Sequence, residues 1–276
     1  MSNPIVIIDS NYLCRRAQYT TGGMQYNGIR TGVIYGFLKE IANLRERFGP
    51  KNFVFCFDSQ KSKRKDYCPL YKKNRDDRIK NLSKYEFEEE SHFRTQIILL
   101  QNELLEELGF ANVIAESGYE ADDLIASAAK SALPKNSVIV SSDHDLYQLL
   151  SDNVVIWHPA KKQLMTADSF QKEYGISPSK WHRVKSIAGC ATDCVAGVLG
   201  VGEVTAIKYL TGQLGEYSSA WGKINRATDR IRHNHILVKL PFPGTPEIEI
   251  KNDKISKIAW SRMVKKYGMT SLSGML

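Results

Sequence analysis

Ile5-Val6-Ile7-Ile8-Asp9, near the start of the chain, is a short β-branched run that ends on an acid, and the strand-like run Phe53-Val-Phe-Cys-Phe-Asp58 also ends on an acid. Similar strand-like runs occupy residues 112–115 and 137–141. Helical patterns of apolar residues separate them, at residues 31–47, 93–108 and 121–132. This regular alternation of strand and helix predicts an α/β fold with a parallel sheet that is covered on both faces.

Acidic residues follow the predicted strands. In parallel sheets of this kind, ligands bind beyond the carboxyl ends of the strands. Three acids also begin the helix at 121–132, where acids commonly do no more than complement the helix dipole. Mutual repulsion among so many acids at one edge predicts bound divalent cations, most simply magnesium. The eight carboxylates are Asp9, Asp58, Glu120, Asp122, Asp123, Asp143, Asp145 and Asp193.

The composition is that of a basic globular protein. The chain has 276 residues, with 38 Lys and Arg against 30 Asp and Glu, a formal charge of +8 and 42% hydrophobic residues. These values exclude a disordered, fibrous or collagen-like chain, and the length suits one or two domains. A basic balance is compatible with nucleic acid, an anionic membrane or an acidic partner, so the charge alone does not decide among them.

Neither a membrane span nor a disulfide framework is expected. No apolar run approaches the ~20 residues that cross a bilayer, and the N-terminus lacks the basic start and cleavage site of a signal peptide. The cysteines are odd in number and lack the spacing of a zinc ribbon, so they predict reduced thiols: Cys14, Cys56, Cys68, Cys190 and Cys194. We therefore expect an intracellular, cytoplasmic protein.

The excess positive charge is concentrated between residues 61 and 80. This segment carries nine basic residues against three acids, a net charge of +6. Such a run is often a solvated helix face. Tyr67, Tyr71 and Tyr85 are interleaved with the bases or follow them, which suits phosphate contact combined with base stacking. The sequence leaves open whether the segment is ordered.

The second half of the chain has a different pattern. From residue 166 it becomes helical and more polar, and we place a domain boundary at 160–168, giving domains 1–165 and 166–276. Gly197-Val-Leu-Gly200-Val-Gly202 precedes a helical stretch that contains Thr205 and Lys208. Two helices around a glycine hairpin can present backbone N–H groups to a phosphate, although a simple structural turn explains the string equally well.

Six segments in this order resemble the 5′ nuclease superfamily, which includes phage and bacterial flap endonucleases, 5′–3′ exonucleases and the nuclease domain of bacterial DNA polymerase I. They are Ile8-Asp9-Ser10-Asn11, Phe57-Asp58, Tyr71-Lys72-Lys73-Asn74-Arg75, Gly118-Tyr-Glu120-Ala-Asp122-Asp123, Ser141-Ser-Asp143-His-Asp145 and residues 197–206. The resemblance implies a PIN-like nuclease domain and a helical arch or clamp at about residues 61–92. It also implies a helix-hairpin-helix type DNA-binding domain that can hold a potassium ion.

The resemblance assigns roles to individual residues. It implies one Mg²⁺ ion held by Asp9, Asp58, Glu120, Asp122 and Asp143 with support from Asp123, and a second held by Asp145 and Asp193, with Mn²⁺ as a substitute. Lys72 matches the arch lysine that contacts the scissile phosphate. Arg75, one turn away, is expected to share the charge that develops on that phosphate, and Arg16 is expected to be a second phosphate clamp. Tyr71 either stacks on a terminal base or packs on the arch. The expected DNA contacts of the hairpin are Gly200, Gly202, Thr205 and Lys208.

One segment departs from the family pattern. Where the family has Gly-Asp-x-x-Asp-Asn, this chain reads Gly189-Cys190-Ala191-Thr192-Asp193-Cys194. The second site therefore lacks a carboxylate, and we expect its ion to be weakly held or completed by substrate phosphate oxygens. The alternative interpretations are that Cys190 and Cys194 are small buried residues without a metal role or, less favoured, that they form a zinc site.

The function that follows is a magnesium-dependent 5′–3′ exonuclease or flap endonuclease that acts near 5′ ends of DNA during replication. The expected substrates are 5′ flaps, nicked duplexes and RNA primer–DNA hybrids, and a replicative polymerase is a candidate partner of a monomeric enzyme in a bacterium or phage-infected cell. Two alternatives are a degenerate relative that binds branched DNA but cuts poorly, and a PIN-type ribonuclease. The glycine hairpin and the long basic segment disfavour the ribonuclease.

Overall fold

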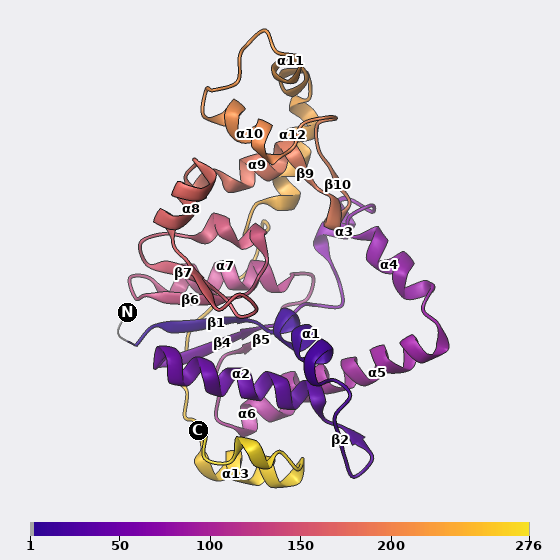
Figure 1. Cartoon of the computed structure of the whole chain (residues 1–276), viewed down its shortest axis with the longest axis vertical. Coiled ribbons are helices and arrows are strands. Elements are labelled where there is room, and N and C mark those ends of the chain that lie inside the picture. Colours follow the sequence, from indigo (N-terminus) through magenta and orange to yellow (C-terminus); the bar gives the residue numbers. More distant parts are fainter. Residues whose placement is uncertain (1–2, 276) are drawn as a thin grey trace.

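A six-stranded sheet organises the computed structural model, which describes residues 3–275 (Figure 1). Its strand order is β5-β4-β1-β6-β7-β8, and every neighbouring pair is parallel except β7 and β8. The strands are β1 (Ile5–Asp9), β4 (Asn52–Cys56), β5 (Val113–Ile114), β6 (Ser137–Val140), β7 (Val154–His158) and β8 (Gln163–Met165). The predicted α/β class and parallel sheet are confirmed.

The alternation of side chains along the central strand builds two cores. Val6 and Ile8 point into one and Ile5 and Ile7 into the other, because successive side chains of a strand face opposite ways. The first core includes residues of α1 (Ser10–Thr21), α2 (Gly32–Phe48), α5 (Lys84–Leu99) and α13 (Lys257–Lys266). Helix α5 continues through a π-helical turn (Leu100–Leu104) into α6 (Leu105–Glu107), and both of these segments also contribute to this core. The second includes residues of α7 (Ala121–Ala132), η2 (His144–Leu149), α8 (Ala167–Tyr174) and α9 (Trp181–Ala188).

The basic segment folds as an ordered helical arch at one side of the sheet. It runs through α3 (Lys63–Tyr67) and α4 (Lys73–Lys80) into the long helix α5 (Figure 1). Ser83 begins α5 with a capping box, in which its side chain accepts from the backbone N–H of Glu86 and its own N–H donates to the Glu86 carboxylate. On the sheet side, the guanidinium of Arg15 donates to both oxygens of Glu90 at 2.9 and 3.1 Å. The arch is therefore held in place by contacts with α1 as well as by its own helical hydrogen bonds.

A helical part follows the sheet. It contains η3 (Pro178–Lys180), α10 (Glu203–Leu210), α11 (Ser219–Arg226) and α12 (Thr228–Val238), with a short hairpin of β9 (Gly189–Cys190) and β10 (Val195–Ala196) around η4 (Ala191–Asp193). Gly189 lies at φ +80°, and a Cβ there would come within 2.4 Å of backbone atoms of Val195 and Gly197. Only glycine fits this close turn, which sets the direction of the hairpin.

The last residues return to the sheet. Trp260, Met263 and Val264 of α13 belong to the same core as Val6 and Phe53, and η5 (Thr270–Leu272) follows them. The C-terminal end of the segment predicted as a second domain thus packs on the first. A small hairpin of β2 (Gln25–Tyr26) and β3 (Ile29–Arg30) completes the fold. Within residues 3–275, no helix has the length and apolar character needed to cross a membrane.

Candidate active site

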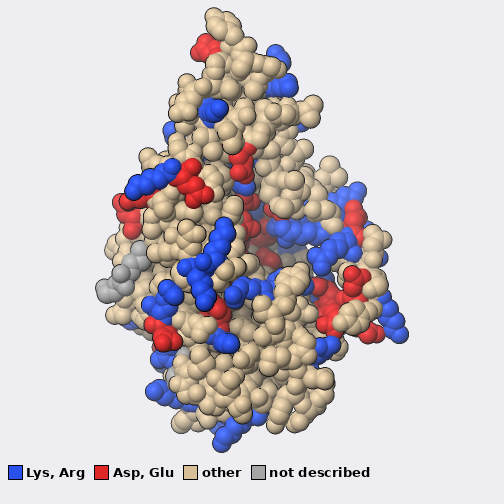
Figure 2. All heavy atoms as spheres, in the orientation of Figure 1, with Lys and Arg blue, Asp and Glu red and all other residues tan. Residues whose placement is uncertain are grey.

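Four aspartates meet at the carboxyl edge of the sheet. Asp9 ends β1, Asp58 follows β4, Asp143 follows β6, and Asp122 lies in the first turn of α7. Because β1, β4 and β6 are parallel neighbours, their ends share one edge. The carboxylate of Asp9 accepts hydrogen bonds from the Tyr12 N–H at 3.0 Å and the Ser141 hydroxyl at 2.8 Å. Figure 2 shows acidic side chains in a hollow at the centre of this face, with basic side chains on both sides.

The four acids lie close together, but only Asp9 is buried; Asp122 is half-buried, and Asp58 and Asp143 are exposed. Desolvation, and then the charges of Asp58 and Asp143, raise the pKa of Asp9 from 3.8 to about 7. Desolvation at the sheet edge also raises the pKa of Asp58, and desolvation together with the charges of Asp143 and Asp9 raises that of Asp122 well above its usual range. None of the four takes part in a salt bridge with a residue of the described chain. A set of oxygen ligands with unbalanced charge fits a hard divalent cation.

Glu120 differs from these acids because it is paired with the arch. Its Oε2 accepts from the Lys72 ammonium at 2.8 Å and from the Tyr71 hydroxyl at 3.0 Å. Burial opposes the charge of Glu120, but Lys72 and Arg64 outweigh burial and lower its pKa. The structure thus brings Lys72 to the acidic edge, as the sequence predicted, where its ammonium is paired with the Glu120 carboxylate. Arg75 is also there, at 2.8 Å from Asp193.

A second group of ligand atoms lies beside the first. Asp145, Cys190 and Asp193 each offer one such atom, and the three lie within 4.8 Å of one another. Burial and the charge of Asp143 raise the pKa of Asp145 to about 6, although Lys185 lies 3.2 Å from it and opposes the shift. Lys185, whose other partner is Glu203 at 2.8 Å, is a site residue that sequence reasoning missed. Cys190 is half-buried: it packs against the apolar cluster that contains Tyr71 and Val195, and its thiol also lies 4.0 Å from an Asp145 oxygen.

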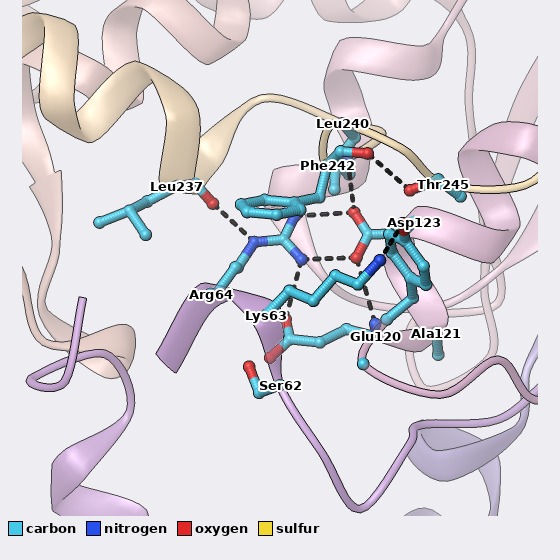
Figure 3. A network of polar contacts seen from close by, with 12 residues as sticks. Ser62, Lys63, Arg64, Glu120, Ala121, Asp123, Leu237, Leu240, Phe242 and Thr245 are labelled. Carbon is cyan, nitrogen blue, oxygen red and sulfur yellow. Dashed lines mark hydrogen bonds and ion pairs between the residues drawn. The ribbon is translucent and has the colours of Figure 1, made fainter. Parts of the chain in front are cut away.

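Asp123 belongs to a separate network (Figure 3). It is fully buried, and its two oxygens accept from the guanidinium of Arg64 at 2.5 and 2.7 Å. The N–H groups of Phe242 and Glu120 also donate to Asp123, at 2.7 and 3.1 Å, while Arg64 Nε donates to the Leu237 carbonyl at 2.8 Å. The predicted metal role of Asp123 is corrected here to a structural one, because its oxygens are already in use.

Two other predicted residues lie elsewhere. Arg16 faces Glu40 at 3.6 Å and lines a separate hollow of about 610 Å³ with Arg47 and Trp157, so the structure does not bring it to the acids. The side chain of Tyr71 is buried, at 3% exposure, and packs against Val195. Tyr71 therefore presents no ring face to a base, and the packed alternative describes it.

The glycine hairpin is exposed, as DNA contact requires. Gly200 has φ +77°, Gly202 precedes α10, and both are exposed, as is Lys208, whereas Thr205 is partly buried. Beside them lies a hollow of about 420 Å³ lined by Val198, Leu199, Lys223, Arg226, Ala227, Asp229 and Arg230. Sequence reasoning missed the basic residues among them, Lys223, Arg226 and Arg230, although their spacing of three and four residues is a helical signal.

Comparison with known proteins agrees with this geometry. A sequence model of the 5′–3′ exonuclease N-terminal resolvase-like domain matches residues 4–175. The chain belongs to this family. It is 28% identical over 258 residues to a 5′–3′ exonuclease of Buchnera aphidicola, covering 91% of this chain and 82% of that protein. It is also 29% identical over 243 residues to the thermostable DNA polymerase I of Thermus thermophilus, covering 86% of this chain and 26% of the polymerase.

The exonuclease family also accounts for the fold. A T5 5′-exonuclease solved with zinc ions superposes with a TM-score of 0.75 at 20% identity, covering 87% of this chain and 90% of that one. A T5 flap endonuclease solved with DNA and metal ions gives a TM-score of 0.74 at the same identity and coverage. The chain spans about a quarter of the length of the polymerases that it matches. The predicted family is confirmed.

Proposed function

We propose that this protein is a divalent-metal-dependent 5′ nuclease that hydrolyses phosphodiester bonds near 5′ ends and flaps of DNA. The observation that carries the proposal is the set Asp9, Asp58, Asp122 and Asp143, which gathers at one sheet edge without a salt bridge to a basic residue of the described chain. The basic arch over this edge supports a polyanionic substrate. Family membership supports the 5′ polarity.

The four aspartates would hold the metal, with Mg²⁺ favoured by their all-oxygen ligand set and Mn²⁺ as a substitute. A divalent cation at such a site lowers the pKa of water and neutralises charge that develops on a phosphate. Asp9 is positioned for this by Tyr12 and Ser141, and Asp58 by the N–H of Ala121 at 2.8 Å.

Lys72 and Arg75 would act on the scissile phosphate. In the structure each is paired with a carboxylate, Lys72 with Glu120 and Arg75 with Asp193, and a phosphate that enters under the arch would offer each another anionic partner. The side chain of Arg75 is 56% exposed, so it is free to turn toward the substrate. A hollow of about 490 Å³ between α1 and α5, lined in part by Arg15 and Phe93, opens onto Asp58 and provides the route.

The helical part would grip the duplex. Gly200 and Gly202 leave backbone N–H groups accessible, and Lys208 and Lys223 add charge beside them. We also propose a potassium ion at the hairpin and a monomeric state. Residues 1–165 would form the nuclease domain and residues 166–276 the DNA-binding domain, with α13 of the latter packed on the former. A replicative polymerase is the proposed partner, and nicked or RNA-primed DNA the proposed further substrate, in the cytoplasm of a bacterium or phage-infected cell.

The test is cleavage of an end-labelled 5′ flap and of a nicked duplex with Mg²⁺, with Mn²⁺ or with a chelator. We expect cleavage with either metal, none with chelator, and none from Asp122→Asn. Asp168→Asn is the matched control, because Asp168 is an exposed acid in the first turn of α8 as Asp122 is in that of α7. Tight binding of the flap without cleavage under every metal would favour the alternative of a branched-DNA-binding protein.

A further inference from the structure

The second ligand group has a thiol where the rest of the site has oxygens. The Cys190 Sγ lies 4.0 Å from the nearer Asp145 oxygen and 3.0 Å from the Thr192 hydroxyl, and Asp193 completes the set of three. Three separate elements, η2, β9 and η4, contribute these residues. The tight turn at Gly189 sets where β9 leaves α9 and so directs the sulfur toward Asp145.

The chemistry of this set differs from that of the four aspartates. Mg²⁺ prefers oxygen ligands in near-ideal octahedral geometry and binds a thiolate poorly. Co²⁺, Zn²⁺ and Cd²⁺ accept thiolate and carboxylate ligands together. A single carbon-bound sulfur in place of a carboxylate therefore changes which metals the position selects.

Two basic side chains form salt bridges with the carboxylates of this group, and both can move away when a metal binds. Lys185 is 3.2 Å from Asp145 but 2.8 Å from Glu203, so it keeps a closer carboxylate when a metal occupies Asp145. Arg75 reaches Asp193 from the arch with more than half of its side chain in solvent. A divalent cation can therefore displace both without leaving a buried charge unpaired.

We propose that Cys190 makes the second metal position thiophilic, so that it takes Co²⁺, Zn²⁺ or Cd²⁺ in preference to Mg²⁺. The Cys190 thiol loses its proton to solvent as the metal binds, which leaves a thiolate and two carboxylates as protein ligands. The inference rests on the proposed function only in taking the acidic edge as a metal centre. It gives the centre one position for hard cations and one for softer cations.

Titration with Co²⁺ alone, without DNA, tests this directly. A thiolate bound to Co²⁺ produces a sulfur-to-metal charge-transfer band in the near ultraviolet, and we expect that band in the wild type. Cys190→Ser and Cys190→Asp should lose it. Cys194→Ser is the matched control and should keep it, because Cys194 lies four residues away and is not part of the three-ligand group. A band that is absent from the wild type, or that survives in Cys190→Ser, would overturn the proposal.

Competition measures the selectivity. Mg²⁺ in large excess should leave Cd²⁺ on the wild type, whereas Cys190→Asp should bind Mg²⁺ at this position more tightly by about tenfold or more, within the range that altered metal shells produce. Should the variants fail to fold, alkylation of the wild type answers the same question. Cd²⁺ should suppress iodoacetamide labelling of Cys190 and leave that of Cys194 unchanged, because a metal-bound thiolate is not free to attack. Equal labelling of Cys190 with and without Cd²⁺ would contradict the proposal.

The outcomes separate this inference from the proposed function. A cobalt band without flap cleavage would leave the thiophilic position standing and refute the nuclease. Mg²⁺-dependent cleavage without a cobalt band would do the reverse.

Discussion

Two arginine–carboxylate pairs fix the ends of the arch, and they differ in burial. Arg64 and Asp123 are 3% and 0% exposed, whereas Arg15 and Glu90 are 36% and 17% exposed. Removing one partner of a buried pair typically costs about 3–5 kcal/mol, because the other charge stays buried. An exposed pair contributes about 0.2–1 kcal/mol. We therefore expect Arg64→Met to lower the free energy of unfolding by about 3–5 kcal/mol and Arg15→Met by less than about 1 kcal/mol.

The size of the Arg64 effect follows from what Asp123 keeps. After Arg64→Met its carboxylate retains only the N–H groups of Phe242 and Glu120 as donors. Arg64→Lys should lower the free energy of unfolding less than Arg64→Met, because an ammonium still supplies the positive charge although it cannot form the two parallel hydrogen bonds. Arg64→Met combined with Asp123→Leu should recover part of the loss, because no unpaired charge is then buried.

Urea unfolding at pH 7 without metal, followed by circular dichroism, measures these differences. A shifted midpoint at constant slope reports stability rather than a change in the unfolded state. Equal losses for Arg64→Met and Arg15→Met, or no recovery in the double variant, would refute the reasoning. Either result would mean that burial of the Arg64 pair does not set its contribution.

Three further predictions concern the site. Asp143→Asn should abolish flap cleavage in an end-labelled assay while DNA affinity stays equal or rises, because a negative charge near phosphate is removed; retained cleavage would contradict this. Lys72→Ala should lower the single-turnover cleavage rate by about 10²–10³ and change DNA affinity much less. The control is its exposed neighbour, since Lys73→Ala should change neither quantity. An equal fall in rate and affinity would reduce Lys72 to a binding role. Burial and neighbouring carboxylates raise the pKa of Asp9 from 3.8 to about 7, so the contribution of Asp9 to the stability of the metal-free protein is present below pH 3.8 and is lost as the pH rises through 7. The melting temperature of Asp9→Asn should therefore fall less than that of the wild type between pH 4 and pH 7, and parallel curves would contradict the shift.

The central strands could be predicted from sequence because local pattern alone determines them. The run from Ile5 to Asp9 is β1 to the residue, since alternate residues of a β-branched segment feed two cores and no other arrangement buries both faces. The helix at 121–132 was also predicted at its observed bounds. Strands β7 and β8 were not predicted. Strand β8 is short and mostly exposed, with no β-branched residue, whereas β7 carries a local signal, Val154-Val155-Ile156, that sequence reasoning missed.

Side-chain direction was harder to predict than the position of an element. Asp122 and Asp123 are adjacent and chemically identical, yet one faces the metal edge and the other is closed on Arg64, 59 residues away in the chain. Nothing local to the motif indicates which acid has that partner. Cys190 shows the same limit, because sequence identified the departure from the family pattern but not that the thiol would still face Asp145.

The pairing of charges explains how the arch and the metal edge work together. The arch cations Lys72 and Arg75 form salt bridges with Glu120 and Asp193 and, within the described chain, none with Asp9, Asp58, Asp122 or Asp143. Had these bases paired with the four aspartates, a metal would have to break those ion pairs before it could bind. Because they pair with Glu120 and Asp193 instead, they can exchange one anionic oxygen for another when a phosphate arrives, and the four aspartates stay in place. The fold thereby keeps the four aspartates available for a cation while the arch remains attached in the absence of DNA.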